Sequence, residues 1–145
     1  MRVLLQRVSE AAVTVGGRQV AAIGPGLLAL VGVARNDDEA AASWLADKTL
    51  GLRIFPDDDK PMNRSVTDIG GEILVVSQFT LAADTKKGTR ASFTRAAPPE
   101  LGRELFEHFV VQCKKRLNIV ETGVFGANMH VSLTNDGPVT FWLES

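Results

Sequence analysis

The sequence predicts a single α/β domain spanning residues 1–145, with a mixed, largely antiparallel, barrel-like sheet and two main helices packed on it. Three observations lead to this prediction. Short apolar runs of strand-like composition recur along the chain and are separated by glycine and proline. Two longer segments instead carry apolar residues at helical spacing. The chain has 145 residues, 45% of them hydrophobic, so one domain can bury a core without disulfide bonds or metals.

The first third of the chain is predicted to be a small β unit. Gly16-Gly17 readily forms a two-residue hairpin turn, and Gly24-Pro25-Gly26 is a clear break. After that break Leu27 to Ala34 is almost continuously apolar, which is typical of a strand buried on both faces. The flanking segments with strand patterns are Arg2–Val8, Ala12–Val15 and Arg18–Ile23.

Two helices are predicted farther along the chain. The first runs from about Asp38 to about Leu50, because Asn36 to Glu39 supply capping side chains and negative charge. The second opens at Pro98-Pro99, where a missing N–H costs little. Its apolar stripe includes Cys113, which is predicted to be an inert core thiol. The residues at helical spacing are Ala41, Trp44, Leu45, Lys48 and Leu52 in the first helix, and Leu101, Leu105, Phe109, Cys113 and Leu117 in the second.

Several shorter elements complete the predicted fold. Asp57-Asp58-Asp59 reads as an exposed loop, because no further ligands for a cation accompany it. Near the end of the chain, Asn135 to Thr140 contain a Gly-Pro pair between two strand patterns, which predicts a hairpin turn. The additional predicted strands are Arg53–Phe55, Glu72–Val76, a half-buried strand over Met129–Thr134, and Val139–Leu143.

Composition and motifs exclude several classes of chemistry. The chain has one cysteine and two histidines, and His108 and His130 are far apart, so neither a disulfide nor a zinc site is expected. We find no motif for a serine hydrolase, a nucleoside triphosphate or a dinucleotide, and we expect no metal and no cofactor. The longest apolar run is too short to cross a membrane, and we expect a cytoplasmic protein. The net charge of −1 provides no global attraction for nucleic acid.

Two polar segments are candidates for a functional site. Ser77 to Leu81 interrupt an apolar strand and offer two hydroxyls, an amide and backbone N–H groups that could bind a developing oxyanion. Ala82 to Ala97 form a long basic loop. Its cations could hold phosphates, and solvated loop charges are the alternative.

Five segments together identify a family that the chain resembles. They are Gln6-Arg7-Val8, Ser77-Gln78-Phe79-Thr80-Leu81, Lys87-Gly88-Thr89-Arg90, Gly123-Val124-Phe125-Gly126-Ala127 and Asn135-Asp136-Gly137-Pro138-Val139-Thr140. In this order and at this separation, they resemble the signatures of the D-aminoacyl-tRNA deacylases over essentially the whole chain.

The resemblance implies a homodimer that hydrolyses the ester between a D-amino acid, or glycine, and the terminal adenosine of tRNA. It implies neither a DNA partner nor a membrane. In this family the bond between Gly137 and Pro138 is cis, and the pair enters the active site of the partner subunit. There its backbone carbonyls would collide with an L side chain, so that chirality is selected by rejection.

The resemblance also assigns roles to individual residues. Arg7 helps to orient Gly137 and Pro138, which form the selectivity element. The residues lining the ester are Ser77, Gln78, Phe79 and Thr80, with the Phe79 and Thr80 N–H groups as donors. Phe125 and Met129 border the adenine. The expected phosphate contacts are Lys86, Lys87 and Arg90. Two alternatives stay open: a hydrolase with Thr80 as nucleophile, and a non-catalytic module that binds a tRNA end or a synthetase.

Overall fold

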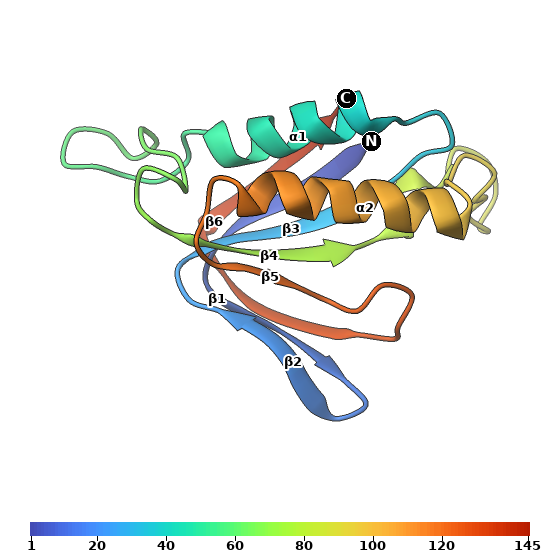
Figure 1. Ribbon diagram of the computed structural model, residues 1–145, viewed down its shortest axis with the longest axis horizontal. Helices are drawn as coiled ribbons and strands as arrows, with labels where there is room; N and C mark the ends of the chain where they lie inside the picture. The colour runs from blue at the N-terminus through green and yellow to red at the C-terminus, as the bar shows by residue number, and fades with distance from the viewer.

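The computed structural model describes residues 1–145 and has two helices lying side by side above a strongly curved sheet (Figure 1). The helices are α1 (Glu39–Gly51) and α2 (Pro99–Lys114), with a short 3₁₀ turn, η1 (Phe79–Ala82). The strands are β1 (Arg2–Val15), β2 (Arg18–Ile23), β3 (Gly26–Gly32), β4 (Glu72–Ser77), β5 (Val120–Thr122) and β6 (His130–Glu144). The predicted mixed sheet with two helices is therefore confirmed.

The long strand β1 organises the sheet. Its two edges pair with β6 on one side and with β3 and β2 on the other, all antiparallel, whereas β3, β4 and β5 run parallel to one another. The strand order is β2-β1-β3-β4-β5, with β6 added at the far edge of β1. The result is a nearly closed, barrel-like sheet whose polar strand ends reach the site described below.

Two hydrophobic cores lie on opposite faces of β3 and β4. Leu27 and Ile73 point toward the helices, where they join a cluster with Phe109. Leu28 and Leu74 point the other way, into a smaller cluster enclosed by the curled strands. Neighbouring residues on each strand thus serve different cores, as expected for alternating side chains. This confirms that the Leu27 segment is buried on both faces.

The Gly-Pro segment does not form the predicted hairpin turn. Strand β6 continues through it, and both flanks pair with the same strand β1. Gln6 lies opposite Thr140 and Val8 lies opposite Asn135, so residues 136–139 all face the single residue Arg7. The segment is therefore a bulge, because one long partner strand holds both flanks while proline has no N–H to offer the ladder.

Two further expectations are wrong. The segment Arg53–Phe55 forms no strand, because only Phe55 pairs, through an isolated bridge with Arg64. Trp44 is 52% exposed, because α1 packs through a neighbouring face that contains Leu45. The predicted cap is correct, since the Asp38 side chain accepts a hydrogen bond from the Ala41 N–H at 2.8 Å. Cys113 is buried, as predicted.

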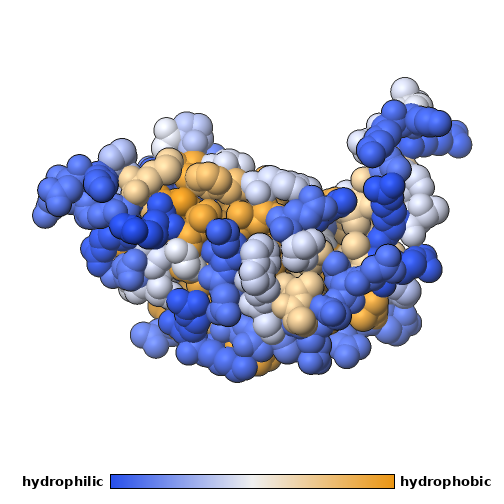
Figure 2. Space-filling model, turned by 90° about the horizontal axis from the view of Figure 1, so that it is seen from above, coloured by the Kyte–Doolittle hydropathy of each residue, from blue (hydrophilic) through white to orange (hydrophobic).

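The segment from Ala83 to Pro98 contains no helix and no paired strand. Most of its side chains are exposed, and it projects from one end of the molecule as a hydrophilic arm (Figure 2). No helix of the chain has the length and apolar character needed to span a bilayer.

Candidate functional site

A cavity of about 520 Å³ lies where β4 runs into η1, opposite the loop that follows β5. Ser77, Gln78 and Phe79 line one side of it, and Phe125 and Met129 line the other. The structure thus brings together five of the predicted site residues from two distant parts of the chain. The volume is in the range of small-molecule sites.

The position of η1 is set by close contact with β3. The Gln78 N–H donates to the Val31 carbonyl oxygen at 2.7 Å. Beneath the turn, a Cβ at Gly32 would lie 2.8 Å from Leu81 Cβ, so only glycine lets η1 approach this closely. The N–H groups of Gln78 and Leu81 donate to backbone carbonyl oxygens, whereas those of Phe79 and Thr80 donate to none of the turn and loop carbonyls. The first N–H groups of a helix have no partner inside it, which leaves these two free to bind an oxyanion.

The Thr80 hydroxyl lies on the exposed side of η1 and contacts Gln78. The Gln78 amide nitrogen donates a hydrogen bond to Thr80 Oγ1. A nucleophilic hydroxyl needs a neighbour that accepts its proton, whereas an amide N–H is a donor. This contact therefore orients Thr80 without activating it.

The opposite wall of the cavity is aromatic. Phe125 packs against Phe106, with ring centroids 6.0 Å apart and planes inclined by 50°, and the Arg103 guanidinium lies 4.7 Å from the Phe125 ring centre. These contacts hold Phe125 beside Met129 and create an apolar surface that can take a flat ring. The sequence alone gave no reason to single out Arg103 or Phe106.

Phe93 is a further aromatic residue near this site. Its ring centre lies 5.1 Å from that of Phe79, and both side chains are exposed. Phe93 comes from the basic loop, and sequence reasoning overlooked it. The available signal was a single large apolar residue within an otherwise polar segment.

Gly137 and Pro138 do not line the cavity; they are exposed on the bulge of β6. The peptide bond between them is cis, and Gly137 has φ of +116°. Arg7 packs beneath them. Its Nη1 donates to the Ile54 carbonyl oxygen at 2.6 Å. Its Nε forms an ion pair with Asp136 Oδ2 at 3.1 Å, but the geometry is not that of a hydrogen bond.

Asn135 closes the base of the bulge, a role that the sequence did not reveal. Its Nδ2 donates to the carbonyl oxygens of Arg7 at 2.9 Å and of Val139 at 3.0 Å. The Thr140 hydroxyl donates back to Asn135 Oδ1 at 3.2 Å. One side chain thus joins both flanks of the bulge to β1 and fixes how Gly137 and Pro138 project.

The basic residues Lys86, Lys87 and Arg90 lie on the exposed arm, outside the cavity. None of the three makes an ion pair. A bridge between Asp84 and Ser92 closes the arm at its base. The three cations are therefore presented to solvent and are free to contact an anionic partner.

The cavity is electrically neutral. None of its lining residues has an ionisable side chain, and no group of three or more His, Cys, Asp or Glu side chains is placed to hold a metal ion. General acid–base catalysis by a lining side chain is therefore not available. What the cavity offers is shape, the hydroxyl of Ser77, the amides of Gln78 and Asn128, and the unpaired backbone N–H of Phe79. Thr80 follows Phe79 in η1 but is not part of the lining.

The family model and the similar sequences agree on one family. The family model described as D-Tyr-tRNA(Tyr) deacylase matches residues 4–144. The chain is 61% identical over 144 residues to a D-aminoacyl-tRNA deacylase of Thioalkalivibrio sulfidiphilus, covering 99% of this chain and 97% of the relative. It is 59% identical over 145 residues to one of Thermomicrobium roseum, covering 100% and 94%.

Two solved structures have the same fold. One, described as a c-Myc DNA unwinding element binding protein, matches with a TM-score of 0.95 and 40% identity and covers 100% of this chain and 99% of its own. The other, described as a probable eukaryotic D-amino acid tRNA deacylase, has a TM-score of 0.84 and 18% identity, with 98% and 97% covered. At that identity, the second structure supports the fold alone.

Proposed function

Because the chain belongs to the D-Tyr-tRNA(Tyr) deacylase family and is thus a D-aminoacyl-tRNA deacylase, a hydrolase, we propose how it selects its substrate. The neutral cavity of one subunit holds the aminoacyl ester, and Gly137 and Pro138 of a second subunit reject L-aminoacyl esters. Esters of D-amino acids and of glycine are hydrolysed. The active protein is a homodimer.

The separation of two site elements within one chain carries this proposal. Gly137 and Pro138 are exposed and lie outside the lining of the cavity, although both elements belong to the signatures quoted above. An exposed bulge whose flanks are held by the Arg7–Asp136 ion pair and by Asn135 is suited to enter a neighbouring molecule. A second copy of the chain would supply the missing wall.

The chemistry uses the groups that a neutral cavity contains. A water molecule adds to the ester carbonyl carbon, and the Phe79 and Thr80 N–H groups stabilise the negative charge that develops on the carbonyl oxygen. The bond to the ribose oxygen then breaks, and that oxygen takes up the proton that the water loses. As the family resemblance implies, a hydroxyl of the terminal ribose assists the water, which fits a cavity whose lining contains no side-chain base.

The adenine and the phosphates of the tRNA occupy the remaining surfaces. Phe125 and Met129 border the adenine, since aromatic rings stack well on bases. Lys86, Lys87 and Arg90 contact the phosphate backbone. These contacts position the ester but carry no information about the chirality of the amino acid.

Chirality is selected by a clash. In the proposed complex the backbone carbonyls of Gly137 and Pro138 face the α-carbon of the amino acid on the side where an L enantiomer carries its side chain. A D enantiomer and glycine present only hydrogen there. Rejection of the wrong substrate needs no extra affinity for the right one, which explains how side chains of different sizes are accepted.

The direct test compares matched tRNA esters. Purified protein is incubated with D-tyrosyl-tRNA, L-tyrosyl-tRNA and glycyl-tRNA, and release of the amino acid is measured against spontaneous hydrolysis without protein. We expect rapid release from the D-tyrosyl and glycyl esters and none above background from the L-tyrosyl ester. Equal hydrolysis of both tyrosyl esters would refute chiral rejection, and retention of tRNA without release would indicate a binding module.

A further inference from the structure

We propose that Arg2 is a positioning residue for hydrolysis, because its guanidinium holds the trailing end of η1 and thereby the Phe79 and Thr80 N–H groups. This inference rests on the function proposed above for η1. Arg2 lies outside the cavity lining, so its role is to place other groups and not to touch the substrate.

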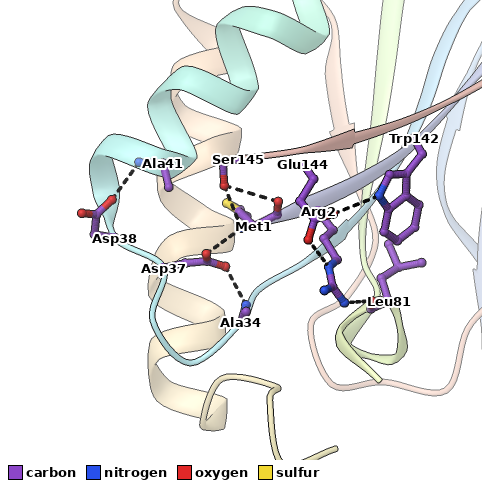
Figure 3. A network of polar contacts seen from close by, with 10 residues as sticks. All are labelled: Met1, Arg2, Ala34, Asp37, Asp38, Ala41, Leu81, Trp142, Glu144 and Ser145. Atoms are coloured by element: carbon purple, nitrogen blue, oxygen red, sulfur yellow. Dashed lines mark hydrogen bonds and ion pairs between the residues drawn. The ribbon is translucent and has the colours of Figure 1, made fainter. Parts of the chain in front are cut away.

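The contacts of Arg2 connect three parts of the chain (Figure 3). Its Nη1 donates to the Leu81 carbonyl oxygen in η1 at 2.7 Å. Its Nε donates to Glu144 Oε1 in β6 at 2.9 Å. The guanidinium also lies 6.0 Å from the ring centre of Trp142, whose indole N–H donates to Glu144 Oε2 at 3.4 Å. The side chain is only 22% exposed, so these contacts hold it in a defined orientation.

The bond to Leu81 is significant because it adds a polar restraint at the C-terminal end of η1 to the packing of the turn on β3. The turn has four residues, and a 3₁₀ turn has poorer hydrogen-bond geometry than an α-helix. At its leading end, the Gln78 N–H is tied to Val31 on β3. At its trailing end, Ala83 bonds back only to Thr80 within the turn itself. The hydrogen bond from the Arg2 side chain thus ties the C-terminal end of η1 to the sheet.

The charges around Arg2 favour this arrangement. A guanidinium donates strongly to a carbonyl oxygen, and its planar shape lets it bond to Leu81 and Glu144 together. The hydrogen bond from Arg2 holds the pKa of Glu144 below its ordinary value, as expected for a carboxylate that pairs with a guanidinium. Glu144 thus balances the charge of the guanidinium through Nε, whereas the bond to Leu81 in η1 comes from a separate nitrogen, Nη1.

Three variants separate positioning from general stability. Arg2→Met removes both hydrogen bonds but keeps a long apolar side chain. Arg2→Lys keeps the charge and can make only one of the bonds well. Glu144→Gln, the matched control, removes the ion pair while leaving the donor to Leu81 in place. Single-turnover hydrolysis of D-tyrosyl-tRNA at saturating protein isolates the chemical step from binding.

We expect Arg2→Met to lower the single-turnover rate about tenfold, with the protein concentration at half-maximal rate changed less than twofold. Arg2→Lys should recover part of the loss, and Glu144→Gln should stay within about twofold of the unmodified protein. In ¹H–¹⁵N spectra the Ala82 amide, which follows the Leu81 carbonyl, should shift in Arg2→Met far more than in Glu144→Gln. A purely structural role would move the melting temperature and not these readouts.

Other outcomes would overturn the inference. These are an unimpaired rate in Arg2→Met, an equal loss in Glu144→Gln, or a rate loss with unchanged η1 amide signals. If Arg2→Met does not fold, Arg2→Lys decides the matter by the same rate and amide measurements. An unmodified protein inactive on the D ester contradicts the proposed function. An active one with an unimpaired Arg2 variant contradicts only the role of Arg2.

Discussion

Substitution of Gly137 by alanine tests whether the bulge must keep its shape. A Cβ at this position would lie 2.7 Å from Val139 Cγ2 and 2.9 Å from Arg7 Nη2. Arg7 cannot easily yield, because it is buried and its Nη1 is bonded to Ile54 at 2.6 Å. The backbone also has φ of +116°, which L side chains rarely adopt.

Both effects lower stability. A left-handed backbone costs an alanine about 1–2 kcal/mol, and forcing atoms into a packed site costs about 1–3 kcal/mol more. The sum of about 2–5 kcal/mol should lower the melting temperature by roughly 6–20 °C, at about 3–4 °C per kcal/mol for a domain of this size. Gly17→Ala is the matched control, because Gly17 has φ of +78° and open space around it. It should lose only the backbone part, about 1–2 kcal/mol.

The activity of the two variants distinguishes a functional bulge from a merely structural one. We expect Gly137→Ala to hydrolyse D-tyrosyl-tRNA about 10–100-fold more slowly at a temperature where it stays folded, since a displacement near 1 Å can cost that much. Gly17→Ala should retain the full rate. Melting curves and D- and L-tyrosyl-tRNA assays provide the measurements. If Gly137→Ala matched Gly17→Ala in rate and still spared the L ester, the bulge would not be the selectivity element.

Three further predictions concern other parts of the chain. Burial raises the pKa of Cys113 to about 12 from 9.0, so the thiol loses its proton at a lower pH in the unfolded chain than in the folded one. The free energy of unfolding should therefore fall as pH rises from about 9 toward 12. Cys113→Ala should show a shallower decline of melting temperature over this range. Thr80→Ala should keep the rate within about fivefold, whereas a loss beyond about a thousandfold would reinstate Thr80 as the nucleophile. Joint replacement of Lys86, Lys87 and Arg90 by glutamine should weaken tRNA binding and reduce the slope of log affinity against log salt by about 2–3; an unchanged slope would place the phosphates elsewhere.

The sequence predicted the helices and most strands because their signals are local. Capping at Asp38 and the four-residue apolar repeat before Cys113 act within single elements. The failures came from tertiary context. Trp44 has helical spacing but lies on the side of α1 that nothing covers. The Gly-Pro pair became a bulge instead of a hairpin turn because β1 is long enough to pair with both flanks of β6, which no local pattern encodes.

The candidate site was predictable in parts. The polar interruption at Ser77 to Leu81 and the absence of a triad both follow from the residues themselves. The residues that position the site were not predictable. Arg2, Asn135 and Phe93 contact residues that lie far from them in the sequence, and their own neighbours in the sequence show only ordinary surface patterns. Only the folded chain brings them together.

The measurement that tests the central claim most directly uses mixed dimers. One chain carries Gly137→Ala with an intact cavity, and the other carries Ala127→Trp, which fills the cavity that Ala127 lines, with an intact bulge. The two are co-expressed with different tags and purified through both. Each homodimer should be impaired, while the mixed dimer should recover about half the unmodified rate on D-tyrosyl-tRNA, because one intact bulge then meets one intact cavity. A mixed dimer that stays as impaired as the two homodimers, or a protein that forms no dimer, would contradict cross-subunit selection.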